Sequence, residues 1–385
     1  MKTIHVVIGA GTWKQDGLRY RRHRLAEFLA SRPETQRVFW LCPAPRPLSN
    51  RRVGKAGKIE QWAVTDVLPQ KVFRFGRYLS LFHKRRLSEF VGVLESLANH
   101  DHVCLWYTFP GFPILKDLFP WDHVVYDRSD LWAAPISGRM SFVAKLRRRV
   151  IAQAERQIVN RADLIFCTSD YLHKETVRNL PAEKRDRVRT IENGVDYQLF
   201  SEDAEQVMGD TGKTVLGYIG GLKPKLDFTL LNEVAGRRPG WQILLVGPDG
   251  TQGDPEFAHL LERDNVIWIG AVPPNEVPHY MRRISIGLMP YKSSPYNSAV
   301  FPLKLFEFLA AGKAAVGIHL PSTKKYEQDS VYACLTSSEP QQLIQVCEHL
   351  EKVKDDPEAI RKRKELAQSK DWSKIFEEML RCAVK

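Results

Sequence analysis

The sequence predicts an α/β protein with two Rossmann-like domains, each built on a parallel sheet. The chain has 385 residues, which is more than a single hydrophobic core usually supports. Short apolar runs alternate with stretches of helical periodicity, a pattern typical of parallel sheets joined by helices. This alternation stops in a polar, acidic stretch at residues 201–213 and then starts again. We therefore expect a domain boundary near residue 200.

The first domain is expected to cover residues 1–199. Its first strand, residues 4–8, leads into a Gly-Ala-Gly loop and then into a helix that starts near Tyr20. The loop lacks the third glycine of a dinucleotide-binding fingerprint, because Lys14 occupies that position, so we do not expect an NAD site. Further apolar runs predict strands at residues 38–41, 103–107, 124–126 and 164–166.

The second domain is expected to cover residues 200–368. Its apolar runs predict strands at residues 214–220, 242–247, 266–270, 286–289 and 314–318. The remaining segment, residues 369–385, is predicted to contain an amphipathic helix, because Trp372, Ile375 and Met379 lie at helical spacing on one side.

A motif at residues 301–317 is the strongest indication of function. Pro302 suits the first turn of a helix, Gly312 suits its left-handed end, and a short apolar run follows. Lys304 and Glu307 are one helical turn apart and so share a face. A lysine in this place can bind a diphosphate, and a carboxylate can accept hydrogen bonds from ribose hydroxyls. A solvent-exposed Lys/Glu pair that merely supports the helix is the alternative.

This motif resembles the donor-binding helix of glycosyltransferases with the GT-B architecture, in which two Rossmann-like domains with parallel sheets face each other across a cleft. The pattern P-x-K-L-x-E-x-x-A-x-G-K is similar to that of the family-four nucleotide-sugar transferases, which include bacterial enzymes of teichuronic acid and exopolysaccharide assembly. The resemblance implies a UDP-sugar as donor substrate, no separate cofactor, and donor contacts from Lys304, Leu305 and Glu307.

The resemblance has two further consequences. In GT-B enzymes the last helix often crosses back to the first domain, so residues 369–385 are expected to do so; packing on their own domain is the alternative. Many family members carry a second glutamate eight residues before the first, where this chain has Ala299. No carboxylate contact to the donor sugar is therefore predicted at that position.

Loops that follow strands are predicted to complete the donor site. Gly220 and Gly221 let the backbone approach a phosphate closely, and Lys223 and Lys225 follow at once. These lysines can offset the diphosphate charge together with Lys304, although lysines in loops are usually solvated. No Asp-x-Asp motif ends a strand, so a metal-independent reaction is expected.

Two later strand ends are assigned to the same pocket. Gly247 begins a Gly-Pro-Asp-Gly loop, which is either part of the nucleotide pocket or a plain turn. Tyr291 lies in a loop that resembles the family's loop ahead of the donor helix, where backbone groups commonly contact the base or the diphosphate.

The catalytic base is predicted to be Asp130. The strand at residues 124–126 delivers Asp127, Arg128 and Asp130 to the carboxyl edge of the first sheet, where ligands of open α/β sheets bind. The segment resembles the Tyr-x-x-Ser-Asp segment of the bacterial glucuronosyltransferase of xanthan assembly, whose aspartate is a proposed base. That resemblance favours UDP-glucuronate as donor. Helix capping by Asp130, or its pairing with Arg128, is the structural alternative.

The acceptor is expected to bind the first domain. Residues 11–24 are rich in side chains that bind anions, which suits an acidic glycan or the phosphate that links a glycan to a lipid. Solvation of a helix start is the alternative. The residues assigned to this site are Gly11, Arg19, Arg22, His23 and Arg128, with Arg21 as a further candidate.

Charge and composition limit the partners and the location. A formal net charge of +12 favours an anionic partner. Two basic clusters, residues 71–86 and 145–150, mix cations with bulky apolar side chains and predict contact with an anionic membrane surface; ordinary helices with solvated faces are the alternative. No run of about 20 apolar residues predicts a membrane span. Because the six cysteines form no C-x-x-C pair, we expect a cytoplasmic protein, peripheral at the inner face of the cell membrane.

Two other classes of function remain open from the sequence. A non-hydrolysing UDP-sugar epimerase shares the two-Rossmann form, and it would consume a UDP-sugar without any acceptor. A nucleic-acid-binding protein is suggested only by the charge, and because no matching motif supports it we expect no nucleic acid partner.

Overall fold

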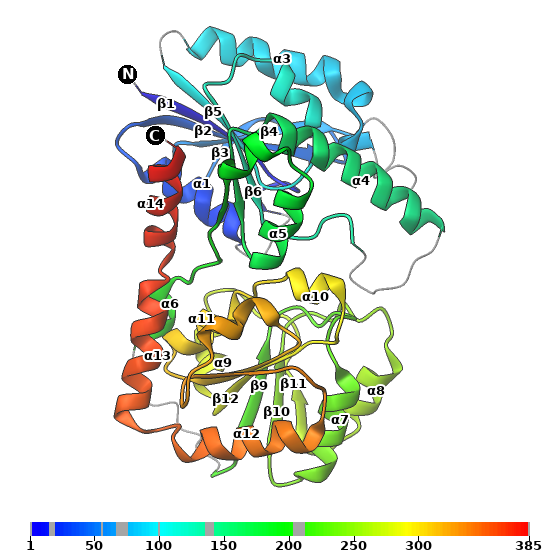
Figure 1. The fold of residues 1–385 in the computed structure, drawn as a ribbon, viewed down its shortest axis with the longest axis vertical. Helices are drawn as coiled ribbons and strands as arrows, with labels where there is room; N and C mark the ends of the chain where they lie inside the picture. The colour runs from blue at the N-terminus through cyan, green and yellow to red at the C-terminus, as the bar shows by residue number, and fades with distance from the viewer. Residues whose placement is uncertain are drawn as a thin grey trace. The chain divides into compact units, whose positions relative to one another are not determined.

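The structure is a computed structural model that describes residues 2–14, 20–54, 57–66, 76–98, 101–134, 142–202 and 212–383. These residues form two compact units, each with its own sheet and flanking helices (Figure 1). The first unit contains the chain up to Glu192 and again from Phe376, and the second contains Asn193–Ile375. The predicted boundary near residue 200 falls slightly later, in the short helix α6 (Tyr197–Ser201).

The described part of the first unit contains an eight-stranded sheet in the order β3-β4-β2-β1-β5-β6-β7-β8. All neighbouring strands are parallel except β3 and β4. The central strands are continuous apolar runs because parallel strands are covered on both faces. The bounds are β1 (Thr3–Ile8), β2 (Thr35–Ala44), β3 (Arg51–Val53), β4 (Ile59–Thr65), β5 (His102–Tyr107), β6 (His123–Arg128), β7 (Leu164–Cys167) and β8 (Val188–Thr190).

Helices join these strands in the first unit (Figure 1). They are α1 (Arg21–Ser31), α3 (Ser80–Ala98), α4 (Phe142–Arg161) and α5 (Asp170–Arg178), with short 3-10 turns η1 (Gly76–Tyr78), η2 (Pro113–Asp117) and η3 (Ala182–Arg187). Ser169 caps α5 by accepting a hydrogen bond from the amide of Leu172. Among the described residues, no helix has the length and apolar character that a membrane span requires.

The described part of the second unit contains a fully parallel six-stranded sheet in the order β11-β10-β9-β12-β13-β14. The sequence predicted all of these strands except β14, which is the last strand at one edge. The bounds are β9 (Val215–Ile219), β10 (Gln242–Val246), β11 (Val266–Trp268), β12 (Ile286–Pro290), β13 (Ala314–Ile318) and β14 (Tyr332–Leu335).

The helices of the second unit include the predicted motif helix. That helix is α11 (Lys304–Ala310), and Gly312 beyond it has a φ of +74°, as predicted for a left-handed helix end. The last helix, α14 (Trp372–Ala383), starts in the second unit, and its residues from Phe376 belong to the first. The others are α7 (Phe228–Arg237), α8 (Pro255–Leu261), α9 (Val277–Arg282), α10 (Pro295–Ala299), η4 (Pro321–Tyr326), α12 (Pro340–Lys352) and α13 (Pro357–Ser369).

Arg363 on α13 is fully buried and binds only backbone carbonyl groups. Its guanidinium donates hydrogen bonds to the carbonyl oxygens of Gly312 (3.0 Å), Val353 (3.0 Å), Lys354 (2.9 Å) and Ser330 (2.7 Å). Burial lowers the pKa of this guanidinium. The contacts satisfy carbonyls beyond the C-terminal ends of α11 and α12, where helical backbones lack partners of their own.

Replacing Arg363 should destabilise the second unit. Arg363→Met leaves several buried carbonyls without donors, and we expect the free energy of unfolding to fall by about 3 kcal/mol. Arg361→Met is the matched control, because Arg361 lies on the same helix but is exposed and pairs with Glu358 and Glu365. Urea unfolding of both variants checks this: equal losses would show that the buried contacts of Arg363 are not stabilising.

Candidate active site

The topology of the second sheet creates one preferred place for a ligand. β10 and β11 lie to one side of β9, whereas β13 and β14 lie beyond β12 on the other side. The strand order therefore reverses between β9 and β12, and ligands of open α/β sheets bind outside the carboxyl ends of the strands at such a point. Lys225 follows β9, Tyr291 follows β12, and Lys304 begins the helix that leads to β13.

Two glycine loops close this edge of the sheet with backbone packed against backbone. Gly220 and Gly247 have φ values of +133° and +138°, which residues other than glycine rarely adopt. A Cβ atom on Gly247 would lie 2.2 Å from the carbonyl oxygen of Gly220. A Cβ atom on Gly220 would lie 2.6 Å from Nζ of Lys304. Glycine at position 220 is therefore what lets the ammonium group of Lys304 lie against the backbone.

Two lysines at this edge lie over buried aromatic rings. Nζ of Lys304 is 5.1 Å from the ring centre of Tyr218, and Nζ of Lys225 is 4.6 Å from that of Tyr291. Both rings are at most 2% exposed. In the part of the chain that the structure describes, neither ammonium group forms an ion pair with a carboxylate. Two positive charges held in this way are complementary to a ligand with two negative charges.

The backbone around Lys225 is fixed by hydrogen bonds to the Tyr291 loop. The amide of Lys292 donates to the carbonyl of Lys225 at 2.9 Å, and the amide of Asp227 donates to the carbonyl of Pro290 at 2.7 Å. Asn297, fully buried on α10, donates through Nδ2 to the carbonyls of Lys225 and Lys292. The Lys225 and Tyr291 segments are thus held together before any ligand binds.

The two tyrosines differ in their acidity. Burial raises the pKa of Tyr218 well above its ordinary value. Burial also acts to raise the pKa of Tyr291, but the nearby ammonium groups of Lys225 and Lys304 outweigh it, so that this pKa is lowered. The hydroxyl of Tyr218 donates a hydrogen bond to the carbonyl of Gly221 at 3.2 Å. Tyr291 is therefore the phenol at this edge whose proton is more easily lost.

The other residues assigned to the donor site lie close along the chain. Lys304 and Glu307 are one turn apart on α11, and both are partly exposed. The side chain of Leu305 is fully buried in the core, which leaves its backbone to meet a ligand. Lys223 is exposed in the loop after β9. Tyr218 and Asn297 were not predicted, because an aromatic residue in a strand and an asparagine in a short helix carry no local sign of a site.

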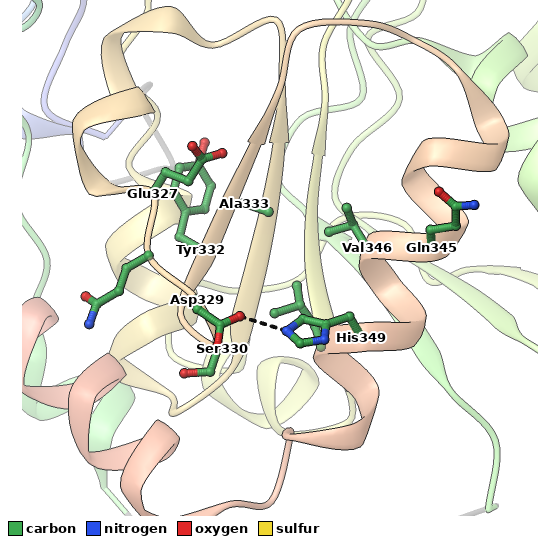
Figure 2. A pocket seen from close by; sticks show the side chains of 10 residues that line it. Glu327, Asp329, Ser330, Tyr332, Ala333, Gln345, Val346 and His349 are labelled. Atoms are coloured by element: carbon green, nitrogen blue, oxygen red, sulfur yellow. Dashed lines mark hydrogen bonds and ion pairs between the residues drawn. The ribbon is translucent and has the colours of Figure 1, made fainter.

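A cavity of about 280 Å³ lies elsewhere in the second unit, between the start of β14 and the end of α12 (Figure 2). Several of its polar groups already have partners within the fold: Nε2 of His349 lies 2.7 Å from a carboxylate oxygen of Asp329, and Glu327 accepts from the amide of Cys334. Tyr332 and Ala333, the first residues of β14, line it. It therefore lies at the amino ends of the strands, opposite to the edge that carries the lysines, and we assign it no ligand.

In the first unit, the charged residues at the end of β6 are mostly used inside the fold. Asp127 is 1% exposed and pairs with Arg21, whose Nε lies 2.8 Å from its carboxylate. Arg21 also donates to the carbonyl of Glu192 at 2.6 Å. Asp130, the predicted base, follows β6 in a bend and is partly exposed. Asp130 is thus more accessible than Asp127.

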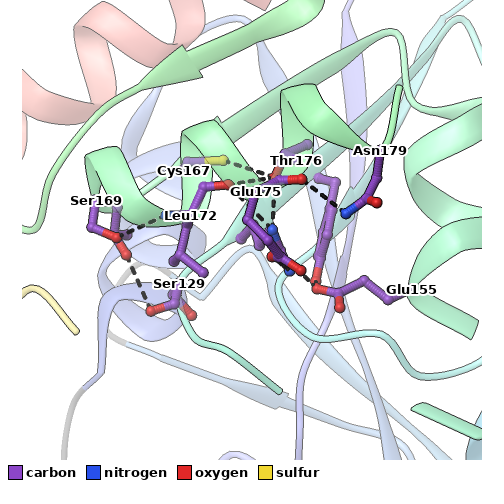
Figure 3. Close-up of polar contacts among 11 residues, drawn as sticks. Ser129, Glu155, Cys167, Ser169, Leu172, Glu175, Thr176 and Asn179 are labelled. Carbon is purple, nitrogen blue, oxygen red and sulfur yellow. Dashed lines mark hydrogen bonds and ion pairs between the residues drawn. The ribbon is translucent and has the colours of Figure 1, made fainter. Parts of the chain in front are cut away.

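The structure corrects the assignment of Arg128 to the acceptor site. Its guanidinium is buried and lies 2.8 Å from Glu155 and 2.5 Å from Glu175, and it donates to Thr176 Oγ1 at 2.7 Å. Figure 3 labels these three partners. The hydroxyl of Tyr126 donates to the same Glu155 carboxylate. Arg128 is therefore a core ion-pair residue that joins β6 to α4 and α5, and it has no exposed face for a glycan.

The structure also corrects the assignment of His23 to the acceptor site. It is 2% exposed, its ring stacks on Trp40 at 4.8 Å, and its edge meets Trp13 at 5.0 Å. Arg22 is partly exposed, with its guanidinium 4.7 Å above the ring of Tyr20. The carbonyl of Gly11 accepts a hydrogen bond from Trp40. Arg19 lies outside the described residues, as do residues 71–75 of the first basic cluster.

Comparison with known proteins identifies relatives of both units. Residues 17–199 match the family described as "Glycosyltransferase Family 4", and residues 213–352 match "Glycosyl transferases group 1". Over 384 residues the chain is 50% identical to TuaH of Bacillus subtilis (strain 168), whose name places it among teichuronic acid biosynthesis glycosyltransferases. That alignment covers 98% of this chain and 96% of the relative.

Several solved structures share this fold. Sucrose-phosphate synthase from Thermosynechococcus elongatus aligns with a TM-score of 0.73 at 15% identity, covering 99% of this chain and 98% of its own. Anabaena Alr3699/HepE in complex with UDP and glucose aligns with a TM-score of 0.68 at 14% identity, covering 98% of each chain. WaaG, a glycosyltransferase of lipopolysaccharide biosynthesis, aligns with a TM-score of 0.63 at 14% identity, covering 100% of this chain and 99% of its own. The predicted GT-B fold class is confirmed.

A methyl group on Gly247 should disturb the glycine contact at the sheet edge. Gly247→Ala adds backbone strain and an overlap with the Gly220 carbonyl, and we expect unfolding free energy to fall by about 3 kcal/mol or more. Gly253→Ala is the matched control, because Gly253 also has a positive φ of +78° but open space around its Cβ position. It should lose only about 1 kcal/mol. Equal losses in thermal and urea unfolding would mean that the contact is loose.

Proposed function

The chain belongs to glycosyltransferase family 4, and we propose that it transfers a sugar from a UDP-sugar to a glycan or lipid-linked glycan in the assembly of a cell-wall or extracellular polysaccharide. We propose teichuronic acid as the polysaccharide because the chain is 50% identical to TuaH. UDP-glucuronate is the proposed donor, since the Tyr-x-x-Ser-Asp segment that ends at Asp130 resembles that of a glucuronosyltransferase.

The observation that carries this proposal is the pair of ammonium groups of Lys225 and Lys304, which have no carboxylate partner among the described residues. They lie at the switch point of a parallel sheet, where this class of fold binds ligands. A nucleoside diphosphate sugar carries about two negative charges on its diphosphate, which matches the two lysines. The Anabaena protein HepE, whose structure contains UDP and glucose, has the same fold and supports the choice of UDP.

The proposed chemistry depends on where negative charge develops. As the bond between the sugar and the diphosphate breaks, charge accumulates on the departing UDP. Lys225 and Lys304 stabilise this charge more strongly in the transition state than in the ground state, which accelerates the reaction. Because the lysines supply the positive charge, we propose a reaction that needs no metal ion. Asp130 is proposed to accept the proton of the acceptor hydroxyl.

The first unit is also proposed to contact an anionic membrane surface that carries the acceptor. Leu81 on α3 is 90% exposed next to the exposed Lys84 and Arg85, and Leu146 on α4 is 49% exposed. Leu146 lies within a run of exposed cations, Lys145 and Arg147–Arg149. Each cation contributes about 1 kcal/mol near an anionic leaflet, and exposed leucines add apolar contact. We propose a cytoplasmic protein, peripheral at the inner face of the membrane.

Removal of one of the site lysines should weaken UDP binding. Lys304→Ala or Lys225→Ala removes one of two charges, and we expect UDP affinity to fall by about ten- to a hundredfold, as charge-assisted contacts contribute about 1.5–3 kcal/mol. Lys362→Ala on the exposed face of α13 is the control and should bind UDP normally. Calorimetric titration measures all three. Unchanged affinity in both site variants would contradict the donor-site assignment.

Replacement of the proposed base should separate binding from turnover. Asp130→Asn should keep its UDP affinity, whereas sugar transfer should fall by about a hundred- to ten-thousandfold. Transfer is measured as acceptor-dependent UDP release from UDP-glucuronate in the presence of a membrane fraction. Asp186→Asn, an exposed aspartate in η3 of the same unit, is the control. Near-normal transfer by Asp130→Asn would leave this aspartate with a structural role.

A further inference from the structure

Two side chains from distant parts of the second unit hold the backbone just ahead of α11. Nδ2 of Asn193, the first residue of this unit, donates a hydrogen bond to the carbonyl oxygen of Phe301 at 2.7 Å. Oγ of Ser322 on η4 donates to the carbonyl oxygen of Val300 at 2.5 Å. Both donor residues are buried, so each bond is shielded from water. We call these two bonds, which fix successive carbonyl groups, the carbonyl clamp.

The backbone next to Asn193 is itself held in place. The amide of Val195 donates to the carbonyl of Lys370 at 2.9 Å, and the amide of Trp372 donates to the carbonyl of Val195 at 3.0 Å. A Cβ atom on Gly194 would lie 2.6 Å from the same Lys370 carbonyl oxygen, so only glycine allows the two segments to pack this closely. Asn193 is therefore a fixed donor that sets the place of the Phe301 carbonyl.

The carbonyl clamp lies close along the chain to a lysine of the proposed donor site. Only Pro302 and Leu303 separate Phe301 from Lys304. The ring of Pro302 fixes its φ angle, and Leu303 already has helical angles, with φ of −55° and ψ of −37°. Few backbone torsions are thus free between the clamped carbonyl and the start of α11. A shift of that carbonyl would move Lys304, whose ammonium group lies against Gly220.

Half of the Asn193 side-chain amide has no partner. Its Oδ1 is buried, and among the described residues no group donates a hydrogen bond to it. A buried acceptor without a donor costs stability, which offsets what the bond from Nδ2 contributes. The net stability gained from Asn193 is therefore small. This favours a role in positioning over a role in stability alone.

We propose that Asn193, together with Ser322, is a positioning residue of the donor site: the carbonyl clamp holds Lys304 where its ammonium group meets the diphosphate of the donor. This inference rests on the proposed donor site. Asn193 acts through Lys304 and makes no ligand contact of its own. A lysine whose backbone is fixed in advance loses less conformational freedom when it binds a diphosphate, so the affinity for UDP is higher.

The test is a double-mutant cycle with UDP as the ligand, measured by calorimetric titration. Asn193→Ala removes a donor of the clamp, and we expect UDP affinity to fall by about three- to thirtyfold. In the Lys304→Ala background the same change should alter UDP affinity by less than about twofold, because the side chain through which Asn193 acts is already absent. A merely structural role would lower the affinity by the same factor in both backgrounds, and that result would overturn the inference.

Two further variants keep the test decisive if Asn193→Ala folds poorly. Ser322→Ala is a smaller change in the other half of the clamp, and it should lower UDP affinity in the same Lys304-dependent way. Asn265→Ala is the matched control, because Nδ2 of Asn265 also binds backbone carbonyls, but at the amino end of β11. This variant should lose stability and bind UDP normally. An equal loss of UDP affinity in Asn265→Ala would show that stability, and not position, is responsible.

Failure of the inference can be distinguished from failure of the donor site. If Lys304→Ala and Lys225→Ala both bind UDP as tightly as wild type, the proposed function fails, and the inference fails with it. If Lys225→Ala alone loses affinity, or if the effects of Asn193→Ala and Lys304→Ala multiply, the donor site stands and only the role of Asn193 is wrong.

Discussion

The proposed donor site depends on one arrangement: two ammonium groups held at the same edge of a parallel sheet, with no carboxylate partner among the described residues. Lys225 and Lys304 are held close to one sheet edge by aromatic rings, a glycine backbone and a bonded pair of loops, and not by carboxylates. A surface lysine would avoid this arrangement by turning into water. Packing of the surrounding core keeps both groups in place, and so the proposed donor site is preorganised for an anionic ligand.

At the carboxyl edge of the first sheet, by contrast, several charged side chains are already paired with each other. Asp127 pairs with Arg21, and Arg128 pairs with Glu155 and Glu175, all inside the unit. Buried pairs of this kind are balanced before any ligand arrives, so they define the local structure and offer little to a substrate. The carboxyl edge of the first sheet therefore carries charges that are already paired, whereas that of the second sheet carries two ammonium groups without a carboxylate partner among the described residues, which are the groups proposed for ligand recognition.

Features that depend on the local sequence pattern were predictable, whereas features that depend on contacts between residues far apart in the chain were not. The alternation of apolar runs gave the fold class, and Pro302 and Gly312 bracketed the bounds of α11. Strand β3 was missed because it has only three residues, two of them arginines, and forms a strand by pairing with β4. Strand β4 was missed because polar residues interrupt its apolar ones, and it pairs with β2. Arg128 and His23 seemed available as ligands because a sequence shows a charge or ring without showing what packs around it.

The guanidinium of Arg363 has an effect beyond stability. It lies 3.0 Å from the carbonyl oxygen of Gly312, just past the C-terminal end of α11. A helix carries partial negative charge at this end and partial positive charge at its beginning, and in a short helix the two poles nearly cancel at nearby points. A cation at the negative pole removes this cancellation. The electrostatic potential at the start of α11 is thus more positive than seven residues of helix would produce alone, although Arg363 lies at the opposite end of the helix.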